Sequence, residues 1–411
     1  IYIASGWDFF VIKLDNKGDF SWIHHPQCTG SEIGYGLAVT PAGETYLTGW
    51  FQNTLVFDSA HAITAYGGSD IYVCKLSESG NCLWAKHAGR ENVEYGYKID
   101  TDAEDNCYIT GVTGDSSMFG NLMLNSGGMF VAKYNANGQE LFVNAANGGV
   151  GSNSISVSPD GNGYVAGRIT NYGYFNGIDT IISTYQASDD GYLLAFDSTC
   201  QWKWISVFSG PASDKSRAVY ADETGNAYVT GSFQDTITIG DSIFYSTTDN
   251  IYAATFNKYG SFNYAINAGN NNAIIPTDII SNNQGNVLVT GWFTGSSAFG
   301  NHQTTASNSG DMNLFIAQCA ILNTSSESGL PEQQKALAYP NPCNSLVHFN
   351  FEAASNKCHL QIHSIDNVLY YNEFASCNFA NIDVSSWPSG VYCYKIIDAQ
   401  NMYSGKFIVL H

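Results

Sequence analysis

The chain has 411 residues and a formal net charge of −20, from 36 acidic and 16 basic side chains. This acidic balance excludes nucleic acid and anionic lipid as partners, since both require Lys and Arg patches to neutralise phosphate. Apolar residues make up 44% of the chain, enough for a sizeable core, but no apolar run reaches the length of about 18 residues that a membrane-spanning helix needs. Abundant glycine and aromatic residues predict short strands and tight turns.

The first residues contain no initiator Met and no secretory leader, and WDFFVIKL at residues 7–14 reads as a strand from the middle of a repeat. We therefore expect a processed chain, or a piece of a longer one that continues upstream.

An apolar, β-branched strand that ends in glycine recurs at intervals of 62, 56, 64 and 60 residues. A second strand recurs in the same rhythm, as in FFVIKL, IYVCKL and MFVAKY. An aromatic residue forms a third column, and in most copies a turn glycine precedes it by four positions. The columns are Gly49, Gly111, Gly167, Gly231 and Gly291 for the strand glycine, Trp22, Trp84, Phe142, Trp204 and Tyr264 for the aromatic residue, and Gly18, Gly80, Gly138, Cys200 and Gly260 for the turn. Three columns with one period establish an internal repeat.

Each repeat contains four expected strands, which in the second copy are CLWAKHAG, GYKIDTD, NCYITGV and MFVAKY. Polar turns such as SPDGN and DETGN join the second strand to the third, and a variable stretch before the last strand predicts an extra β-ribbon. Four-stranded units at a fixed period predict an all-β fold: a β-propeller with five complete repeats and a partial one. A β-solenoid is the alternative, although its coils are usually shorter.

Two stretches, Gly36–Gly49 (GLAVTPAGETYLTG) and Asp70–Trp84 (DIYVCKLSESGNCLW), resemble the bacterial SBBP-type repeats associated with seven-bladed propellers. The resemblance extends over the repeats of residues 1–322. It implies a propeller of secreted or surface proteins and no particular activity, because a fold does not determine function.

A polar segment at residues 323–336 predicts a linker, and residues 337–411 alternate strands and turns as in a small Ig-like β-sandwich. This C-terminal segment resembles the type A sorting domain of the Bacteroidetes type IX secretion system. The matching motif residues are Tyr339, Pro340, Asn341, Pro342, Gly390, Tyr392, Gly405 and Lys406. The resemblance implies export to the cell surface of a Bacteroidetes-type bacterium, and the secretion or attachment machinery as a partner.

The ten cysteines and nine histidines predict no metal site and no cofactor. Cys74, Cys107 and Cys319 occupy columns of small or apolar residues, so we expect them to be buried, whereas Cys28 and Cys200 are expected to be exposed. Four cysteines in the C-terminal segment predict one or two disulfides. His359 and His363 lie about 13 Å apart along one strand, too far for a shared metal.

DTDAEDN at residues 100–106 resembles a calcium loop but occupies an ordinary hairpin turn. No motif of a nucleophile, metalloprotease or phosphate loop is present, so we expect no enzymatic activity.

Aromatic side chains are the candidate binding residues, since they stack on sugars or anchor protein contacts. They are Trp50, Phe51, Tyr172, Tyr174, Phe175, Trp292 and Phe293; packing between repeats is the alternative role. We expect a non-enzymatic surface protein that binds an outer-membrane protein or a glycan. The alternatives are a polysaccharide hydrolase or lyase, with carboxylates or a Tyr/His/Arg set converging at one end of the propeller, and a structural adhesin or spacer.

Overall fold

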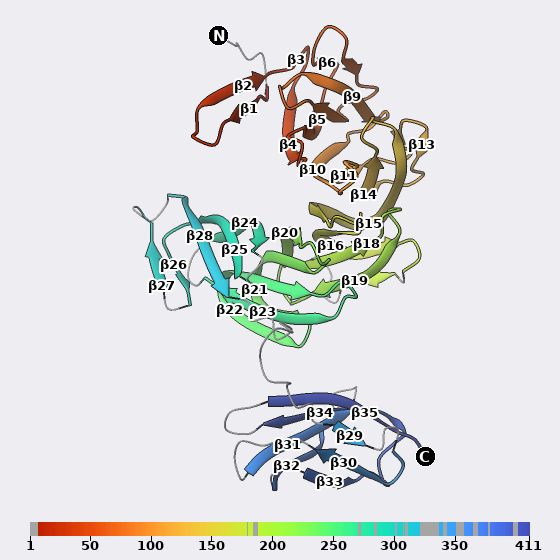
Figure 1. Cartoon of the computed structure of the whole chain (residues 1–411), viewed down its shortest axis with the longest axis vertical. Helices are drawn as coiled ribbons and strands as arrows, with labels where there is room; N and C mark the ends of the chain where they lie inside the picture. Colours follow the sequence, from red (N-terminus) through yellow and green to blue (C-terminus); the bar gives the residue numbers. More distant parts are fainter. Residues whose placement is uncertain are drawn as a thin grey trace. The chain divides into compact units, whose positions relative to one another are not determined.

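A computed structural model of the chain contains strands and no helix among its described residues (Figure 1). Contacts divide it into two units, Ile1–Thr324 and Ser325–His411. The structure describes residues 7–178, 180–183, 188–269, 273–282, 286–300, 302–306, 308, 311–320, 337–339, 343–350, 357–364, 369–376, 379–397 and 402–411. The all-β prediction is confirmed; the expected linker at residues 323–336 lies outside the described residues.

The first unit is a series of antiparallel repeats whose strands pair in chain order. Repeat 1 comprises β4 (Glu32–Val39), β5 (Thr45–Phe51), β8 (Asp70–Leu76) and β9 (Cys82–Gly89). Repeat 2 comprises β10 (Tyr95–Thr101), β11 (Cys107–Thr113), β14 (Gly128–Tyr134) and the first half of β15 (Glu140–Val157). Repeat 3 comprises the second half of β15, β16 (Gly163–Phe175), β18 (Asp189–Phe196) and β19 (Trp202–Phe208).

Repeat 4 comprises β20 (Lys215–Ala221), β21 (Ala227–Ile239), β22 (Ser242–Phe256) and β23 (Phe262–Ala268), and repeat 5 comprises β24 (Ile274–Ser281), β25 (Asn286–Phe293) and β28 (Asn313–Ala320). A hairpin, β1 (Val11–Leu14) and β2 (Phe20–His24), precedes them. First strands pack against the preceding repeat, as β10 does on β4 and β5 and β24 does on β20 and β21.

The aromatic strand closes a repeat, whereas the sequence pattern placed it at the start of the next one. β9 pairs with β8 through the tight turn at Gly80, and it is not paired with β10. The physical reason is the turn: Gly80 has φ +83, which permits a short hairpin between β8 and β9.

The expected ribbons are present, and each contacts the last strand of the preceding repeat or hairpin. β6 (Thr54–Val56) pairs with β7 (Ala62–Thr64) and with β3 (Gln27–Cys28), and β12 (Met118–Phe119) pairs with β13 (Leu122–Met123) and with β9. The end of β16 pairs with β17 (Ile181–Ile182) and with the middle of β15. Thr238 N–H donates to Ser209 O at 3.0 Å, and Gly269 N–H donates to Ala298 O at 2.7 Å in the ribbon β26 (Ser296–Phe299) and β27 (His302–Thr305).

A Trp–Gly contact joins consecutive repeats at the turn end of the strands. The Trp84 ring lies against Gly138 of the next repeat, where a Cβ would approach Cδ2 of the ring to 2.7 Å. Trp84 Nε1–H also donates to Ala136 O in that turn at 3.0 Å. The contacts of Trp22 with Gly80 and Glu78 O, and of Trp204 with Gly260 and Lys258 O, repeat this arrangement. The aromatic and turn-glycine columns of the sequence are therefore two sides of one contact.

The junction between repeats 2 and 3 differs from the others at both the turn position and the aromatic position. Cys200 stands where the other turns have glycine, with φ +59, and the aromatic partner column there holds Phe142 in place of Trp. Asn144 donates to Cys200 O at 2.9 Å and holds this junction together. Cys200 is fully buried, so its expected exposure was wrong; Lys133 and Asn144 of the preceding repeat contact its turn.

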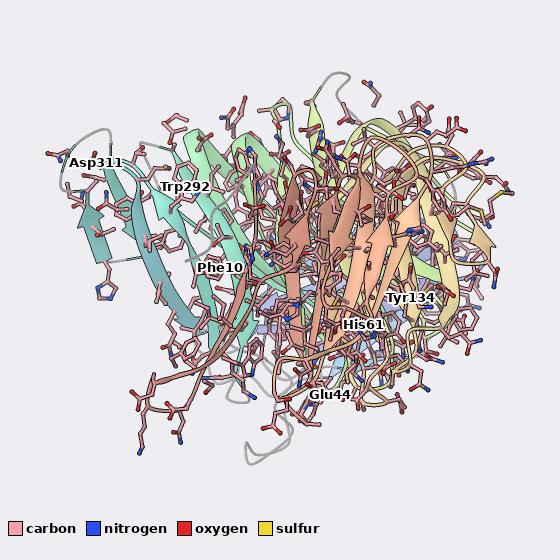
Figure 2. All side chains as sticks on the ribbon, turned by 90° about the horizontal axis from the view of Figure 1, so that it is seen from above. Phe10, Glu44, His61, Tyr134, Trp292 and Asp311 are labelled. Carbon is pink, nitrogen blue, oxygen red and sulfur yellow. The ribbon has the colours of Figure 1, made fainter. Side chains whose placement is uncertain are left out.

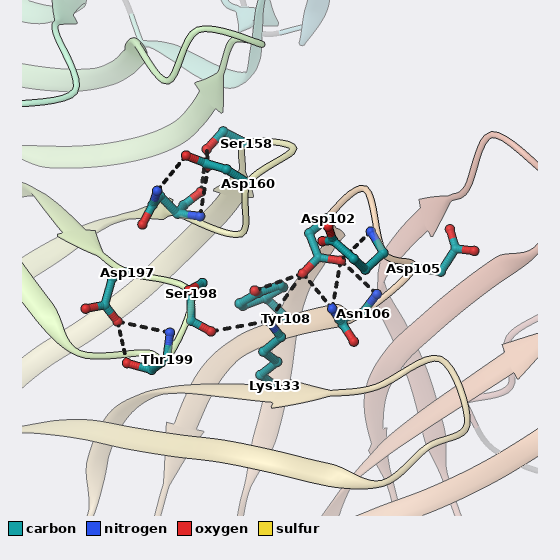
Figure 3. A network of polar contacts seen from close by, with 12 residues as sticks. Asp102, Asp105, Asn106, Tyr108, Lys133, Ser158, Asp160, Asp197, Ser198 and Thr199 are labelled. Atoms are coloured by element: carbon teal, nitrogen blue, oxygen red, sulfur yellow. Dashed lines mark hydrogen bonds and ion pairs between the residues drawn. The ribbon is translucent and has the colours of Figure 1, made fainter.

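A buried lysine reinforces the same junction (Figure 3). Lys133 Nζ lies 3.3 Å from Asp102 Oδ2 and donates to Ser198 O of the next repeat at 3.2 Å. Asp102 Oδ1 accepts the N–H groups of Glu104 and Asn106, which closes the hairpin turn. DTDAEDN is therefore a turn, as expected, with one carboxylate serving both the turn and the lysine.

The strand glycines are required by a close backbone approach. A Cβ at Gly111 would lie 1.9 Å from Tyr95 O, and the corresponding distance at Gly49, from Ile33 O, is 1.8 Å. Each carbonyl belongs to a first strand that bulges opposite the glycine, as between Gly96 and Lys98.

Positions that are buried in the middle of the series are exposed at its two ends. Phe10 (Figure 2) is 60% exposed although the equivalent Tyr72 is fully buried, and Ile316 is 77% exposed although Val73 is fully buried. Each repeat therefore completes its core against a neighbouring repeat.

The second unit has two antiparallel sheets that share one core, which includes Val347, Ile362 and Phe407. One sheet contains β29 (Leu337–Tyr339), β30 (Leu346–Asn350) and β33 (Phe379–Asp383); the other contains β31 (Lys357–Ser364), β32 (Leu369–Ser376), β34 (Gly390–Ile397) and β35 (Met402–Val409).

The cysteines of this unit that the structure describes, Cys343 and Cys393, are free thiols. The side chains of Cys358 and Cys377 lie outside the description, so the disulfide prediction is not decided there.

We expect Gly138→Ala to destabilise the protein more than Gly18→Ala does. Both glycines occupy the same turn position with positive φ, +77 and +86, but only Gly138 carries a tryptophan ring; nothing lies within 4 Å of a Cβ at Gly18. The backbone cost of about 1 kcal/mol is shared, and the ring clash adds about 1–3 kcal/mol at Gly138. Denaturant unfolding of both variants measures the difference, and equal losses would contradict the Trp–Gly contact.

We expect Lys133→Met to cost about 3–5 kcal/mol of unfolding free energy, because it leaves the buried Asp102 carboxylate without its cation. Adding Asp102→Asn, which keeps the turn-closing oxygen, should restore much of the loss. Lys203→Met is the matched control, since Lys203 forms an exposed ion pair with Asp197 worth at most about 1 kcal/mol. A double variant no more stable than Lys133→Met would contradict this role.

Candidate functional site

The predicted binding aromatics divide into buried and accessible residues. Phe51 and Phe175 are fully buried and Phe293 is 2% exposed, so these three pack in the core and cannot meet a ligand. This corrects the sequence prediction, and the reason is strand alternation: each neighbours a residue that points the other way. Tyr172 and Tyr174 are exposed on the ribbon part of β16.

The two tryptophans, Trp50 and Trp292, are partly buried at the ends of β5 and β25. Trp292 lies at the opposite end of the strands from Glu44, which belongs to a turn (Figure 2).

Trp50 begins an aromatic ladder that crosses from repeat 1 to repeat 2. Its ring meets Tyr95 edge-on at 5.7 Å between centroids, and Tyr95 stacks on Tyr97 at 6.2 Å. Tyr97 in turn meets Tyr35 edge-on at 5.7 Å, and Tyr35 is 47% exposed. Burial raises the pKa of the Tyr97 phenol, which keeps it a neutral donor.

A charged network lies at the corresponding strand ends of repeats 3 and 4. Asp189 Oδ1 lies 3.0 Å from Arg168 Nη1, and Asp189 Oδ2 lies 3.2 Å from Lys215 Nζ. The positive charge of Arg168 acts to lower the pKa of Tyr97 and of Arg217. We name the combined set the Tyr–Arg cluster: Tyr35, Trp50, Tyr95, Tyr97, Arg168, Asp189, Lys215 and Arg217.

Four repeats contribute to the Tyr–Arg cluster. Its residues lie near the starts of the first and third strands and near the ends of the second strands, all at the same end of the repeats. Aromatic faces bind the apolar faces of sugar rings, and a guanidinium beside a carboxylate supplies fixed donors and acceptors for hydroxyl groups. The arrangement is suited to binding and holds no nucleophile with a base.

A hollow of about 580 Å³ lies between β9 of repeat 1 and the ribbon β12–β13 of repeat 2. Tyr66 is 70% exposed, and its ring centroid lies 4.7 Å from that of His87. Both residues line the hollow, together with Met118, Met123 and Arg90. Flexible methionines and an exposed tyrosine are typical of protein-binding surfaces.

One group of three potential metal ligands exists among the described residues: oxygen, nitrogen and sulfur atoms of Asp58, His61 and Cys82 lie within 4.8 Å of one another. His61 Nδ1 lies 2.8 Å from Asp58 Oδ1, and Cys74 Sγ lies 3.6 Å from Cys82 Sγ. Cys28 is partly buried, and its Sγ donates to Gln52 O at 3.1 Å.

The sequence analysis found Trp50 but missed the rest of the Tyr–Arg cluster. Tyr97, Arg168 and Lys215 are separated by long stretches of chain, and only the repeat register aligns the strand ends that carry them. A usable signal was available: Arg168 occupies the column of Trp50 and Trp292.

The C-terminal unit matches a known family of domains. Residues 337–410 match the secretion system C-terminal sorting domain. The protein is therefore secreted or displayed at the cell surface by the type IX system of a Bacteroidetes-type bacterium.

The motif residues of the sorting domain are placed as follows. Tyr339 lies in β29, Gly390 and Tyr392 lie in β34, and the Tyr392 hydroxyl donates to Pro388 O at 2.8 Å. Gly405 and Lys406 lie in β35, where the structure describes their backbone. Pro340, Asn341 and Pro342 lie outside the described residues.

Two solved structures share low similarity with the chain. A protein of unknown function from Bacteroides caccae is 10% identical with a TM-score of 0.32, over 76% of this chain and 94% of that one. The extracellular domain of a putative hybrid two-component system from B. thetaiotaomicron is 10% identical with a TM-score of 0.16, over 97% of this chain and 72% of that one. No curated protein matches the sequence.

Membrane attachment through a helix finds no support in the described part of the chain, which contains no helix of the length and hydropathy that a span requires.

Proposed function

We propose that the protein is a secreted or cell-surface β-propeller of SBBP-type repeats that binds a glycan through the Tyr–Arg cluster and has no enzymatic activity. Its support is the convergence of an aromatic ladder and an Arg–Asp–Lys network from four repeats on one end of the strands. The propeller arrangement is supported by the successive four-stranded repeats, whose first strands pack against the preceding repeat.

A protein partner in an outer-membrane assembly is the second candidate. The hollow lined by Tyr66, His87 and Met118 favours it, because exposed tyrosine and methionine side chains are typical of protein-binding surfaces. The secretion or attachment machinery is the partner that the sorting domain implies.

A polysaccharide hydrolase or lyase is less well supported. Asp190 and Asp214 are at most 1% exposed, so a sugar cannot reach this carboxylate pair. A glycosidase needs both carboxylates at the scissile bond.

Binding is tested on an array of neutral and uronate-containing oligosaccharides with the full chain. We expect Tyr97→Ala to weaken binding to any retained glycan roughly tenfold, since loss of one stacked ring costs about 1–2 kcal/mol. Tyr174→Ala, on the exposed ribbon, is the matched control and should leave binding unchanged. Equal effects of the two variants, or no glycan bound by the wild type, would refute the glycan site.

Export is tested separately by deleting residues 402–411, which removes β35 and leaves β34 without its edge partner. We expect the truncated chain to accumulate inside the cell envelope while the full chain is cleaved by protease added to intact cells. Normal surface exposure of the truncated chain would show that export does not depend on the sorting domain.

A further inference from the structure

Two acidic side chains meet at three junctions between successive repeats, at the end of the strands opposite the Trp–Gly contact. One acid opens the third strand of a repeat and the other precedes or opens the first strand of the next. The pairs are Asp8 with Glu32, Asp70 with Glu94, and Asp190 with Asp214. In each pair the N–H of the second acid donates to the carbonyl of the residue before the first: Glu32 to Trp7 O at 2.8 Å, Glu94 to Ser69 O at 2.8 Å, and Asp214 to Asp189 O at 2.7 Å.

The identities of the two positions change together. In the two other copies, the third-strand residue is not Asp and the first-strand residue is aliphatic. These pairs are Gly128 with Val150 and Asn250 with Ile274. Two buried like charges repel each other strongly at low dielectric, so packing alone would favour one acid with a neutral partner. The repeats instead place two acids together or none, which indicates that the pair acts as a unit.

The carboxyl of Asp214 accepts no hydrogen bond in its buried site. Asp214 is fully buried, and neither carboxylate oxygen accepts a hydrogen bond. The amides of Gly210 and Gln234 face it and favour its charged form, but neither reaches hydrogen-bond geometry. Burial, and then the charges of Asp190 and Asp235, raise the pKa of Asp214 to about 8. A buried charge of this kind requires either a proton or a cation.

The acid pair at the junction of repeats 1 and 2 also flanks a small buried space, and it has more hydrogen-bond donors around it than Asp214 has. Asp70 and Glu94 are both fully buried, and Glu94 Oε2 accepts no hydrogen bond. A Cβ at Gly89 would lie 3.0 Å from an oxygen of each carboxyl, Asp70 Oδ1 and Glu94 Oε2, so the two oxygens flank one small space. At the other pair, a Cβ at Gly210 would lie 3.0 Å from Asp214 Oδ2 and 1.7 Å from Thr236 O, which adds a backbone carbonyl.

We propose that the pairs Asp70/Glu94 and Asp190/Asp214 each bind one divalent cation of the calcium type, which joins consecutive repeats. The donors are carboxylate and carbonyl oxygens with no nitrogen or sulfur, the set that hard cations prefer. Extracellular calcium sites operate at dissociation constants of about 10⁻⁴–10⁻³ M, which suits an exported protein. A cation would offset the negative charge of the two buried carboxyls at each junction.

Calcium binding to the full chain is measured by equilibrium dialysis with elemental analysis at about 1 mM calcium. We expect at least two calcium ions per chain, and a rise of a few degrees in Tm over a sample with chelator at the same ionic strength. No bound calcium and no rise in Tm would overturn the proposal and leave a shared proton as the explanation of the pairs.

The decisive variant copies the natural junction between repeats 4 and 5: Asp190→Asn with Asp214→Ile. We expect it to bind one calcium ion fewer than the wild type and to have a lower Tm in calcium. In chelator we expect the Tm of the double variant to equal or exceed that of the wild type. The reason is that the variant lacks the two buried carboxyls, which are unfavourable without a cation. A variant with a lower Tm in both conditions, by the same amount, would show that the acids are structural only.

Two further variants guard against misfolding and general charge effects. The single change Asp214→Asn keeps the volume of the side chain and should also lose one ion. Asp241→Asn removes an exposed acid from a turn of repeat 4 and should leave both the calcium content and the Tm shift unchanged. Loss of calcium in Asp241→Asn would mean that binding follows net charge, which would contradict a site at the pairs.

Discussion

The tryptophan ring that lies on the turn glycine of the next repeat is the contact on which the first unit depends. It fixes the distance between consecutive sheets, because a Cβ on the turn would meet the ring at about 2.6–2.9 Å. Trp84 Nε1–H and the buried Lys75 Nζ both donate to Ala136 O, so stacking, hydrogen bonding and charge act on one short loop. Lys133 donates in the same way to Ser198 O in the turn of Cys200. At the junction of repeats 2 and 3, the aromatic column has the smaller ring of Phe142 and the turn column has the larger residue Cys200.

The two ends of each junction have different chemistry. At the turn end, neutral and positively charged donors meet carbonyls and are satisfied within the protein. At the opposite end, two carboxyls meet in a buried space, next in sequence to residues of the Tyr–Arg cluster: Tyr95 follows Glu94, Asp189 precedes Asp190 and Lys215 follows Asp214. The carboxyl pairs are therefore adjacent in sequence to the side chains that we propose as the ligand-binding surface.

The repeat period, the strands, the ribbons and the sorting domain could all be predicted from the sequence, because each depends on local patterning or on a motif. The pairing of the aromatic strand with the preceding strand was missed, since spacing alone does not tell which neighbour a strand joins. Phe51, Phe175 and Phe293 were misjudged because alternation was not applied at the strand ends. The Tyr–Arg cluster and the acid pairs combine residues of different repeats, and only aligning the copies column by column brings them together.

The most direct test of the central claim, that one ring-on-glycine contact couples successive repeats, is a double-mutant cycle at Trp84 and Gly138. The changes Trp84→Phe and Gly138→Cys together recreate the natural junction of Phe142 with Cys200. The account predicts that the double variant is more stable than the sum of the single losses by about 1 kcal/mol or more, because the smaller ring accommodates the new side chain. Losses that add within about 0.5 kcal/mol would show that the two positions act independently and would contradict the account.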